Sequence, residues 1–406
     1  METKPTIRYR WFLLAVAVVA MLFAGIIYAW SILKVPFAQE FGWKPESLSL
    51  NFTLTMCTFC LGGLLGSFLS KRLGVKATCL SAAVLAGGGM CLTGCLSGQS
   101  VLLLYLFYAG MAGLGIGVSY NVIISTVSAW FPDKKGLSSG CIMMGFGASS
   151  LILGNLADSF FKSALGRKGT YLLLGASLFV VLALASLVLK RPAADMVFPA
   201  VSKKKAALAE EFEPRDYTTK EMLCRFSFWC AFVLLILAAA VGNSVISFAR
   251  DLALSVGAEV SLATTLVGVL AVCNGLGRIL TGALFDALGR KQTMVLSTAL
   301  TVVAAAVSLF SVVLGSVPIC IVGLCLTGFS YGSCPTVSTA LILAFYGQKH
   351  FPTNFSIMTC HLIFASFIAT ASSYLLGIFG GYAAVFVLLL CLAVAAFFLN
   401  LTLKKP

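Results

Sequence analysis

Two ionisable side chains stand inside stretches of sequence that are otherwise apolar. Arg278 ends the run Asn274-Gly-Leu-Gly-Arg278, and His361 ends the run Thr359-Cys-His361. An arginine suits a carboxylate because its planar guanidinium donates two parallel charge-assisted hydrogen bonds and stays protonated. A histidine titrates near neutral pH and can exchange a proton. We therefore predict that both residues bind a small carboxylate anion, and that His361 couples this binding to protons.

Each of the two residues has an alternative interpretation. Arg278 could extend to the water at the membrane surface, or it could pair with Asp286, which lies eight residues later. Eight helical residues span about 12 Å, which is too far for a direct pair. A charge at the bilayer centre costs at least ~2.5 kcal/mol, which favours a functional role for Arg278. For His361, a neutral ring bonded to a neighbouring serine or to a backbone carbonyl stays open as an alternative.

Uncharged polar side chains could complete the anion site. Hydroxyl and amide groups can hydrogen-bond a small anion without adding charge. Ordinary packing with a satisfied hydroxyl is an equally good interpretation of each tyrosine taken singly. The predicted binding residues of this kind are Tyr28, Tyr120, Asn121, Asn274 and Tyr331.

The composition shows which elements must position these residues. Hydrophobic residues make up 60% of the 406 residues and charged residues 10%, against an ordinary charged share of about 25%. A soluble, disordered or disulfide-stapled chain is thereby excluded, and an all-α membrane protein is predicted. Apolar runs of about 20 residues can each cross a bilayer. Twelve such runs occur: Trp11–Leu33, Leu48–Ser70, Ala77–Ser97, Val101–Trp130, Leu137–Phe161, Thr170–Leu189, Phe226–Ala249, Val260–Phe285, Thr293–Val317, Pro318–Phe345, Phe355–Phe379 and Tyr382–Leu403.

The basic residues predict the orientation. The chain has 28 Lys and Arg and a net charge of +14, and most of these cations lie in the loops on the side of both termini. Cytoplasmic loops are enriched in Lys and Arg, so we expect both termini inside, in the inner (cytoplasmic) membrane. The same pattern explains the basicity without nucleic acid as a partner. The first span is too long for a signal-peptide core, and we expect it to be retained.

A polar stretch divides the chain into two halves of six spans. Residues 190–225 contain Lys203-Lys-Lys, several glutamates and three prolines, which is typical of a linker. We therefore predict two six-helix bundles, residues 1–189 and 226–406, joined by a cytoplasmic linker. Two sequence patterns recur at a spacing of about 215 residues: Gly66–Lys76 resembles Gly282–Lys291, and Gly113–Tyr120 resembles Gly328–Pro335.

Two six-helix halves with this repeated loop pattern resemble the major facilitator superfamily. Within it, four motifs in family order resemble the oxalate:formate antiporter family and its monocarboxylate-transporting relatives. The motifs are Tyr28-Ala-Trp-Ser31, Trp130-Phe-Pro-Asp-Lys-Lys-Gly136, Asn274-Gly-Leu-Gly-Arg278 and Tyr346-Gly-Gln-Lys-His-Phe351.

The resemblance implies transport by alternating access, with the substrate between the halves near the midplane. It implies that Arg278 binds the substrate carboxylate. His361 falls where members that exchange the oxalate dianion carry a lysine, which favours a monocarboxylate such as lactate, pyruvate or formate, although oxalate/formate exchange stays open. We expect a monomer in the lipid bilayer, without a cofactor or metal. The family's cytoplasmic gate maps onto Asp286, Arg290, Asp133 and Lys134, with Ser70 in place of the acid in the first half.

Other functions fit the sequence less well. A proton-coupled drug antiporter typically needs an acid within the membrane, but Asp158 and Asp286 lie near span ends. A carboxylate sensor of the same fold would need an output domain. No phosphate-binding loop, nucleophile elbow or His-Glu metal motif predicts an enzyme. The pair Cys57-x-x-Cys60 lacks the further ligands of a zinc site.

Overall fold

The predicted all-α membrane fold is confirmed. The computed structural model describes residues 9–98, 100–193, 196 and 215–405, except for the side chains of Lys135 and Asp286. Within this part of the chain, twelve helices are long and apolar enough to cross a membrane, and they indicate a multi-pass membrane protein. The predicted linker lies largely outside the described residues. The boundaries of the two predicted bundles therefore stay a prediction.

Six spans form the first half, and several are built from consecutive shorter helices. Span 1 combines α1 (Tyr9–Ala24), the 3-10 turn η1 (Gly25–Ala29) and α2 (Trp30–Leu33), with the short α3 (Val35–Phe41) after it. The others are α4 (Pro45–Arg72); α5 (Gly74–Gly94); α6 (Val101–Leu104), η2 (Tyr105–Gly113) and α7 (Leu114–Ser128); α8 (Lys135–Ser149), η3 (Ser150–Gly154) and α9 (Asn155–Phe161); and α10 (Gly166–Val188).

The second half follows the short helix α12 (Thr219–Leu223) and also contains six spans. They are α13 (Phe226–Ser255), α14 (Val260–Leu288), α15 (Arg290–Leu314), α16 (Val317–Tyr346), α17 (Phe351–Thr359) with α18 (His361–Phe379), and α19 (Tyr382–Thr402).

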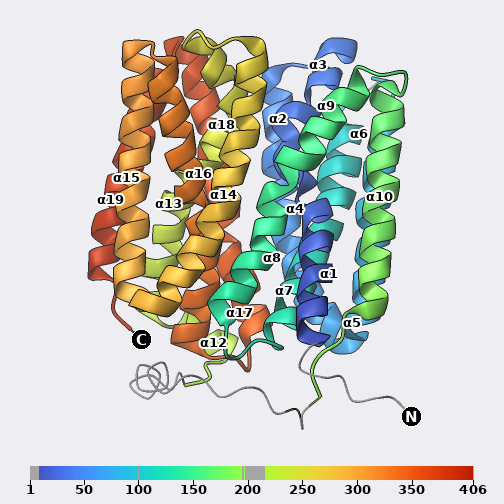
Figure 1. Cartoon of the computed structure of the whole chain (residues 1–406), viewed down its shortest axis with the longest axis vertical. Helices are drawn as coiled ribbons and strands as arrows, with labels where there is room; N and C mark the ends of the chain where they lie inside the picture. The colour runs from blue at the N-terminus through green and yellow to red at the C-terminus, as the bar shows by residue number, and fades with distance from the viewer. Residues whose placement is uncertain (1–8, 99, 194–195, 197–214, 406) are drawn as a thin grey trace.

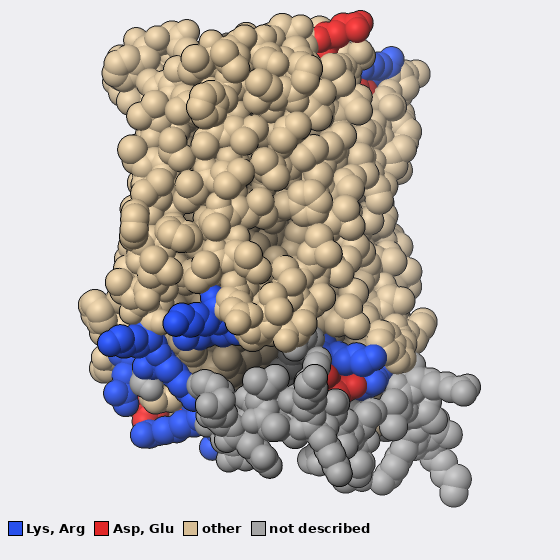
Figure 2. Space-filling view, turned by 60° about the vertical axis from the view of Figure 1, so that its left-hand side comes forward, with Lys and Arg blue, Asp and Glu red and all other residues tan. Residues whose placement is uncertain are grey.

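The two halves stand side by side, with their helices roughly along the long axis of the molecule (Figure 1). The first span begins and the last span ends at the same end, where α12 also lies. In Figure 2, lysine and arginine side chains gather around this end, while the band above it is free of charged side chains on the face in view. A charge-free band between charged ends is the pattern of a protein that spans a bilayer. We call the end with α12 the basic end and the other the distal end.

Within each half, glycines bring two helices into backbone contact, and the contacts occur at equivalent positions in the two halves. A Cβ on Gly62 would meet the carbonyl of Leu114, and a Cβ on Gly277 would meet the carbonyl of Phe329. Both the glycines and the carbonyls are about 215 residues apart, so the repeat seen in the sequence is also a repeat of packing. Small residues allow such close approach of membrane helices. Two more pairs of contacts share this spacing. The contact of Gly113 with Thr55 corresponds to that of Gly328 with Leu270, and the contact of Gly117 with Phe59 corresponds to that of Gly332 with Asn274.

Two of the predicted site residues lie where a span is interrupted. Tyr28 belongs to the 3-10 turn η1, and His361 is the first residue of α18, directly after the break at Cys360. A third interruption occurs in α13, where Phe248 has non-helical dihedral angles. Interrupted helices expose backbone groups within a membrane and are common at substrate sites of transporters.

The segment before α12 fastens the loop that carries the Tyr346–Phe351 motif. The carboxylate of Asp216 accepts hydrogen bonds from the backbone N–H groups of Gln348 and Lys349 at 2.9 and 3.0 Å. Gly347 has a φ of 79°, and a Cβ there would overlap Asp216. Glycine is therefore required at this turn both by its conformation and by the close approach of the acid.

Candidate functional site

Arg278 lies deep in the molecule on α14, and only 1% of its surface is exposed. Its Nε donates to Asn274 Oδ1 at 3.2 Å, one helical turn away, and its Nη1 donates to the backbone carbonyl of Met143 on α8. Nη2 is buried and has no hydrogen-bond partner. None of the ion pairs found among the described residues includes Arg278. The arginine therefore presents an unneutralised charge and an unused donor, which is a costly arrangement without a ligand.

Glycine at position 147 makes room for the guanidinium. A Cβ on Gly147 would lie 3.4 Å from both Cζ and Nε of Arg278. Because Gly147 belongs to the first half and Arg278 to the second, the charged group sits at the boundary between the halves. An alternating-access carrier binds its substrate at this boundary.

A cluster of aromatic rings lies beside the guanidinium, with Tyr28 of the first half nearest to it. The centroid of Tyr28 lies 6.0 Å from Arg278 Cζ, at the outer limit for a cation–π contact. Phe146 packs edge-on against Tyr28 and against Tyr120, with centroids 5.1 and 5.2 Å apart. Tyr331 of the second half lies 6.1 Å from Tyr28. Of the predicted residues, the structure thus brings Arg278, Asn274, Tyr28, Tyr120 and Tyr331 together.

A chain of hydrogen bonds crosses between the halves beside this cluster. The hydroxyls of Tyr28 and Tyr331 lie 3.1 Å apart, and the Tyr331 hydroxyl donates to Asn243 Oδ1 at 2.7 Å. Asn243 in turn donates to the hydroxyl of Ser366 at 3.3 Å. Sequence reasoning missed Asn243, although a carboxamide within the apolar span α13 is the same kind of signal that identified Asn274. It completes the polar side of the site.

The space left between these residues is small. A cavity of about 10 Å³, lined by Tyr28, Ser150, Ile246 and Asn274 among others, holds about one water molecule. The halves also touch towards both ends, through Thr53 and Thr370 with hydroxyls 2.6 Å apart, and through Asn121 and Ser356 at 2.7 Å. Contacts between the halves therefore lie on both sides of the site, and the cavity described beside Arg278 is small.

Asn121 joins the two halves on the basic side of the cluster. Its Nδ2 donates to the hydroxyl of Ser356 and, at 3.3 Å, to the carbonyl of Pro352, both on α17. Ser356 lies 3.0 Å from the carbonyl of Gly63. By the repeat spacing, Gly63 is the counterpart of Arg278 in the first half. The described hydrogen bonds of Asn121 thus place it in a contact between halves.

His361 is 2% exposed, and its described hydrogen bond is with α17, the helix that precedes it in the same span. Its Nδ1 lies 2.7 Å from the carbonyl of Met358, so this nitrogen carries a proton and donates it. Nε2 is buried without a partner. No hydrogen bond links His361 to Arg278 among the described residues, and their joint action on a substrate stays a prediction.

Three of the four predicted gate residues contact partners within their own halves. Asp133 pairs with Arg10 at 2.7 Å, and Lys134 lies over the ring of Trp11. Arg290 lies over the ring of Phe345, 4.8 Å from its centroid. The side chain of Asp286 lies outside the described residues. Besides the Asn121 contact, Lys71 bridges the halves at the basic end by donating to the hydroxyl of Thr353 at 3.2 Å.

Comparison with known proteins gives consistent relatives. YhjX, an MFS-type transporter of Escherichia coli (strain K12), is 24% identical over 86% of this chain and 84% of its own length. The oxalate:formate antiporter of Oxalobacter formigenes is 25% identical over 70% of this chain and 65% of its own length. Monocarboxylate transporter 13 of Rattus norvegicus is 23% identical over 89% of this chain and 81% of its own length. The resemblance inferred from the four motifs is thus confirmed.

A solved structure and a family model agree with this assignment. The structure of the proton:xylose symporter XylE superposes with a TM-score of 0.76 over 98% of this chain and 96% of that chain, at 13% sequence identity. The family model of the Major Facilitator Superfamily matches residues 12–255 and 235–406. The fold, the relatives and the matched family model together show that this chain is a transporter of the major facilitator superfamily.

Proposed function

We propose that this transporter is a secondary carrier that moves a small carboxylate by alternating access, with the carboxylate bound to Arg278. The observation that carries the proposal is the buried Arg278, which has no acidic partner among the described residues and keeps Nη2 free. A carboxylate accepting from Nη2 would supply both the missing hydrogen bond and the missing charge. The names of the relatives, an oxalate:formate antiporter and a monocarboxylate transporter, support this substrate class.

A monocarboxylate such as lactate, pyruvate or formate fits the single fixed charge best. Oxalate/formate exchange is the variant that fits if His361 supplies a second positive charge. A proton-coupled antiporter of drugs or other organic solutes is the second candidate function. It finds no support near Arg278, because no acid pairs with this residue in the described part of the chain.

We further propose that the basic end is cytoplasmic and that the membrane is the inner membrane. The cluster of lysine and arginine side chains at that end supports this orientation. The distal end then faces outwards. The chain would act as a monomer, with the lipid bilayer around it and the carboxylate, alone or with a proton, as its ligand.

Uptake of radiolabelled formate, lactate, pyruvate and oxalate into proteoliposomes tests the proposal. We expect at least one of them to be accumulated or exchanged, and Arg278→Lys to lower its uptake at least tenfold, equal to about 1.4 kcal/mol. A lysine keeps the charge but replaces the planar fork by a point charge. Arg72→Lys, the same change at the exposed end of α4, is the control. Normal uptake by a well-inserted Arg278→Lys protein would exclude this binding role.

A further inference from the structure

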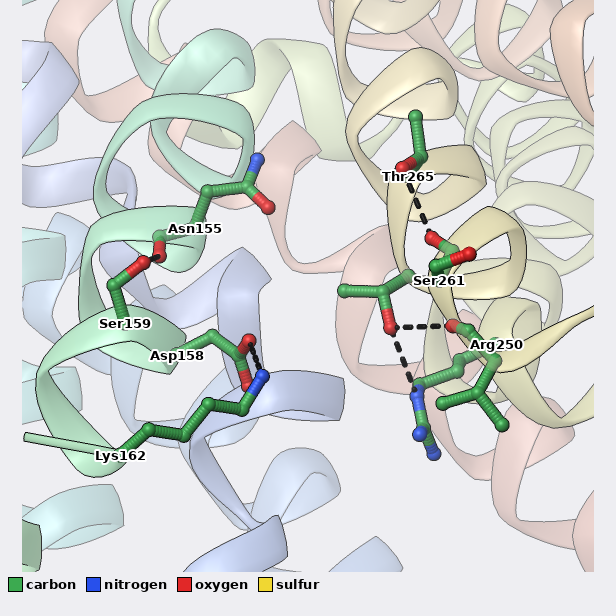
Figure 3. Close-up of polar contacts among 9 residues, drawn as sticks. Asn155, Asp158, Ser159, Lys162, Arg250, Ser261 and Thr265 are labelled. Atoms are coloured by element: carbon green, nitrogen blue, oxygen red, sulfur yellow. Dashed lines mark hydrogen bonds and ion pairs between the residues drawn. The ribbon is translucent and has the colours of Figure 1, made fainter.

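A second polar cavity lies between the halves at the distal end. Its volume is about 310 Å³, and its lining comes from the ends of α3, α9 and α10 in the first half and of α13 and α14 in the second. Figure 3 shows Asp158 of α9 and Lys162 directly after this helix on one side of it, and Arg250 of α13 with Ser261 of α14 on the other. The cavity is large enough for a small hydrated anion, unlike the closed space beside Arg278.

The cations around this cavity differ in how they are neutralised. Lys162 pairs with Asp158 at 2.6 Å. Arg167 pairs with Glu40 at 2.7 Å and also donates to two backbone carbonyls. For Arg250, the described contact is a hydrogen bond from Nε to the hydroxyl of Thr264 at 3.3 Å, and no described ion pair includes it. The two pairs cancel, so the cavity carries one net positive charge, on Arg250.

We propose that this cavity is an outer anion site, in which Arg250 binds the carboxylate substrate before it reaches Arg278. The inference rests on the proposed function for the class of ligand. The Nη groups of Arg250 can donate to both oxygens of one carboxylate, as the fork geometry allows. A concave surface of net positive charge also raises the local concentration of anions. A carboxylate in this site would thus be concentrated at the point where the halves must part.

The outer anion site adjoins a weak ion pair that joins the halves. Lys34, at the end of span 1, lies 4.0 Å from Asp251, the residue after Arg250. Burial lowers the pKa of Lys34, Asp251 raises it, and the charge of Arg250 lowers it further. Asp251 is 53% exposed, so the pair is held loosely. A carboxylate on Arg250 would offer Lys34 a second acceptor and would compete with Asp251, which favours separation of the halves at this end.

Side-resolved kinetics test the outer anion site. With the carboxylate offered at the distal face of oriented proteoliposomes, we expect Arg250→Gln to raise KM about three- to fivefold, in the range of an exposed charge contact. The KM measured from the basic face should stay unchanged, and Arg250→Lys should recover most of the loss. Lys168→Gln, which removes an exposed cation on α10, is the matched control. Equal KM values for Arg250→Gln and wild type at the distal face would overturn the inference.

A chemical probe tests the site without relying on transport. In a Val260→Cys protein, a negatively charged methanethiosulfonate should modify Cys faster than a positively charged one, because Val260 lines the same cavity as Arg250. Adding Arg250→Gln should lower this rate ratio about threefold, and formate or oxalate should slow the modification only while Arg250 is present. The protein without Val260→Cys gives the background from native cysteines. If Arg250→Gln leaves the rate ratio unchanged, the outer anion site is refuted, even if Arg278 binds carboxylates. If the ratio depends on Arg250 but no carboxylate is taken up, only the proposed transport is refuted.

Discussion

Tyr331 shows how much of the site depends on single hydroxyl groups. It donates to Asn243 and lies beside the hydroxyl of Tyr28, so two buried polar groups rely on one oxygen. Leaving a buried acceptor unpaired costs about 1–3 kcal/mol. A change that removes only this oxygen therefore tests the polar chain separately from the charge of Arg278.

We expect Tyr331→Phe to lower the melting temperature of the purified protein, because the Asn243 carbonyl loses its donor. Tyr108→Phe is the matched control, since the buried hydroxyl of Tyr108 has no partner and its removal should be neutral or stabilising. Thermal unfolding followed by loss of monodisperse protein measures both. Equal melting temperatures for the two variants would show that the Tyr331 hydroxyl contributes nothing.

His361 is the second residue-scale test, and it concerns coupling. An ordinary histidine has a pKa of about 6.5, near physiological pH. Such a side chain can take up a proton on the more acidic side of a membrane and release it on the other side. We expect an inward proton gradient to speed monocarboxylate uptake, and His361→Gln to weaken this pH dependence more than it weakens binding.

The chain offers its own control for this prediction. It contains two histidines, and the other, His350, lies in the loop before α17. His350→Gln should keep the wild-type pH dependence of uptake. If His361→Gln also keeps it, the ring serves packing or static polarity, and one-for-one exchange that ignores the pH gradient would favour an antiporter.

At the scale of elements, close packing of α14 on α16 positions Arg278. A Cβ on Gly277 would come to 2.5 Å from the carbonyl of Phe329, closer than real Cβ atoms approach a backbone atom. Gly277→Ala should therefore push the helices apart and destabilise the protein by about 1–3 kcal/mol, the usual range for overpacking.

Gly88→Ala on α5 is the control for Gly277→Ala, because nothing lies within 4 Å of a Cβ at this position. It should leave the melting temperature unchanged or raise it, since alanine favours the helix. A Gly277→Ala protein as stable as Gly88→Ala would mean that α14 and α16 can separate without cost.

The elements themselves were predictable because each span must be apolar over its whole length. All twelve predicted spans correspond to helices, and the boundary expected near Val317 falls at Ser316, between α15 and α16. The ends were less accurate: α4 begins at Pro45, three residues before the predicted Leu48, because proline suits the first turn of a helix.

The finer features of the site could not be read from apolarity. Nothing in the composition around Cys360 or Gly25 announces an interrupted helix, because the break depends on contacts between spans. The hydrogen-bond partners of Arg278 also differ in how far the sequence could indicate them. Asn274 was predicted as a binding residue, and the structure shows it one helical turn from Arg278, bonded to it. The carbonyl of Met143 could not be predicted, because it is a backbone group that every residue carries and it comes from the other half.

At the scale of the whole molecule, the two ends should face different compartments. Exposed native cysteines mark them: Cys95 follows α5 at the distal end, and Cys224 follows α12 at the basic end. A membrane-impermeant maleimide should label Cys95 in intact cells and Cys224 only after permeabilisation, as the enrichment of Lys and Arg at the basic end requires.

Cys95→Ser and Cys224→Ser identify which site is labelled in this experiment. Labelling Cys224 in intact cells would reverse the orientation. A cysteine placed at Ser202, in the linker outside the described residues, should behave like Cys224.

The two halves have equivalent positions at Gly63 and Arg278, but only the second half carries a charge there. One half carries no side chain at the position where the other carries a full elementary charge. With a monocarboxylate bound, the centre of the carrier is neutral, and without it the centre is positive. A membrane potential of 100 mV acts on one charge with about 2.3 kcal/mol. The membrane potential should therefore change the rate at which the empty transporter returns, but not the rate at which one monocarboxylate is exchanged for another. With a dianion bound, the centre would be negative, so the potential should change the rate of the loaded step.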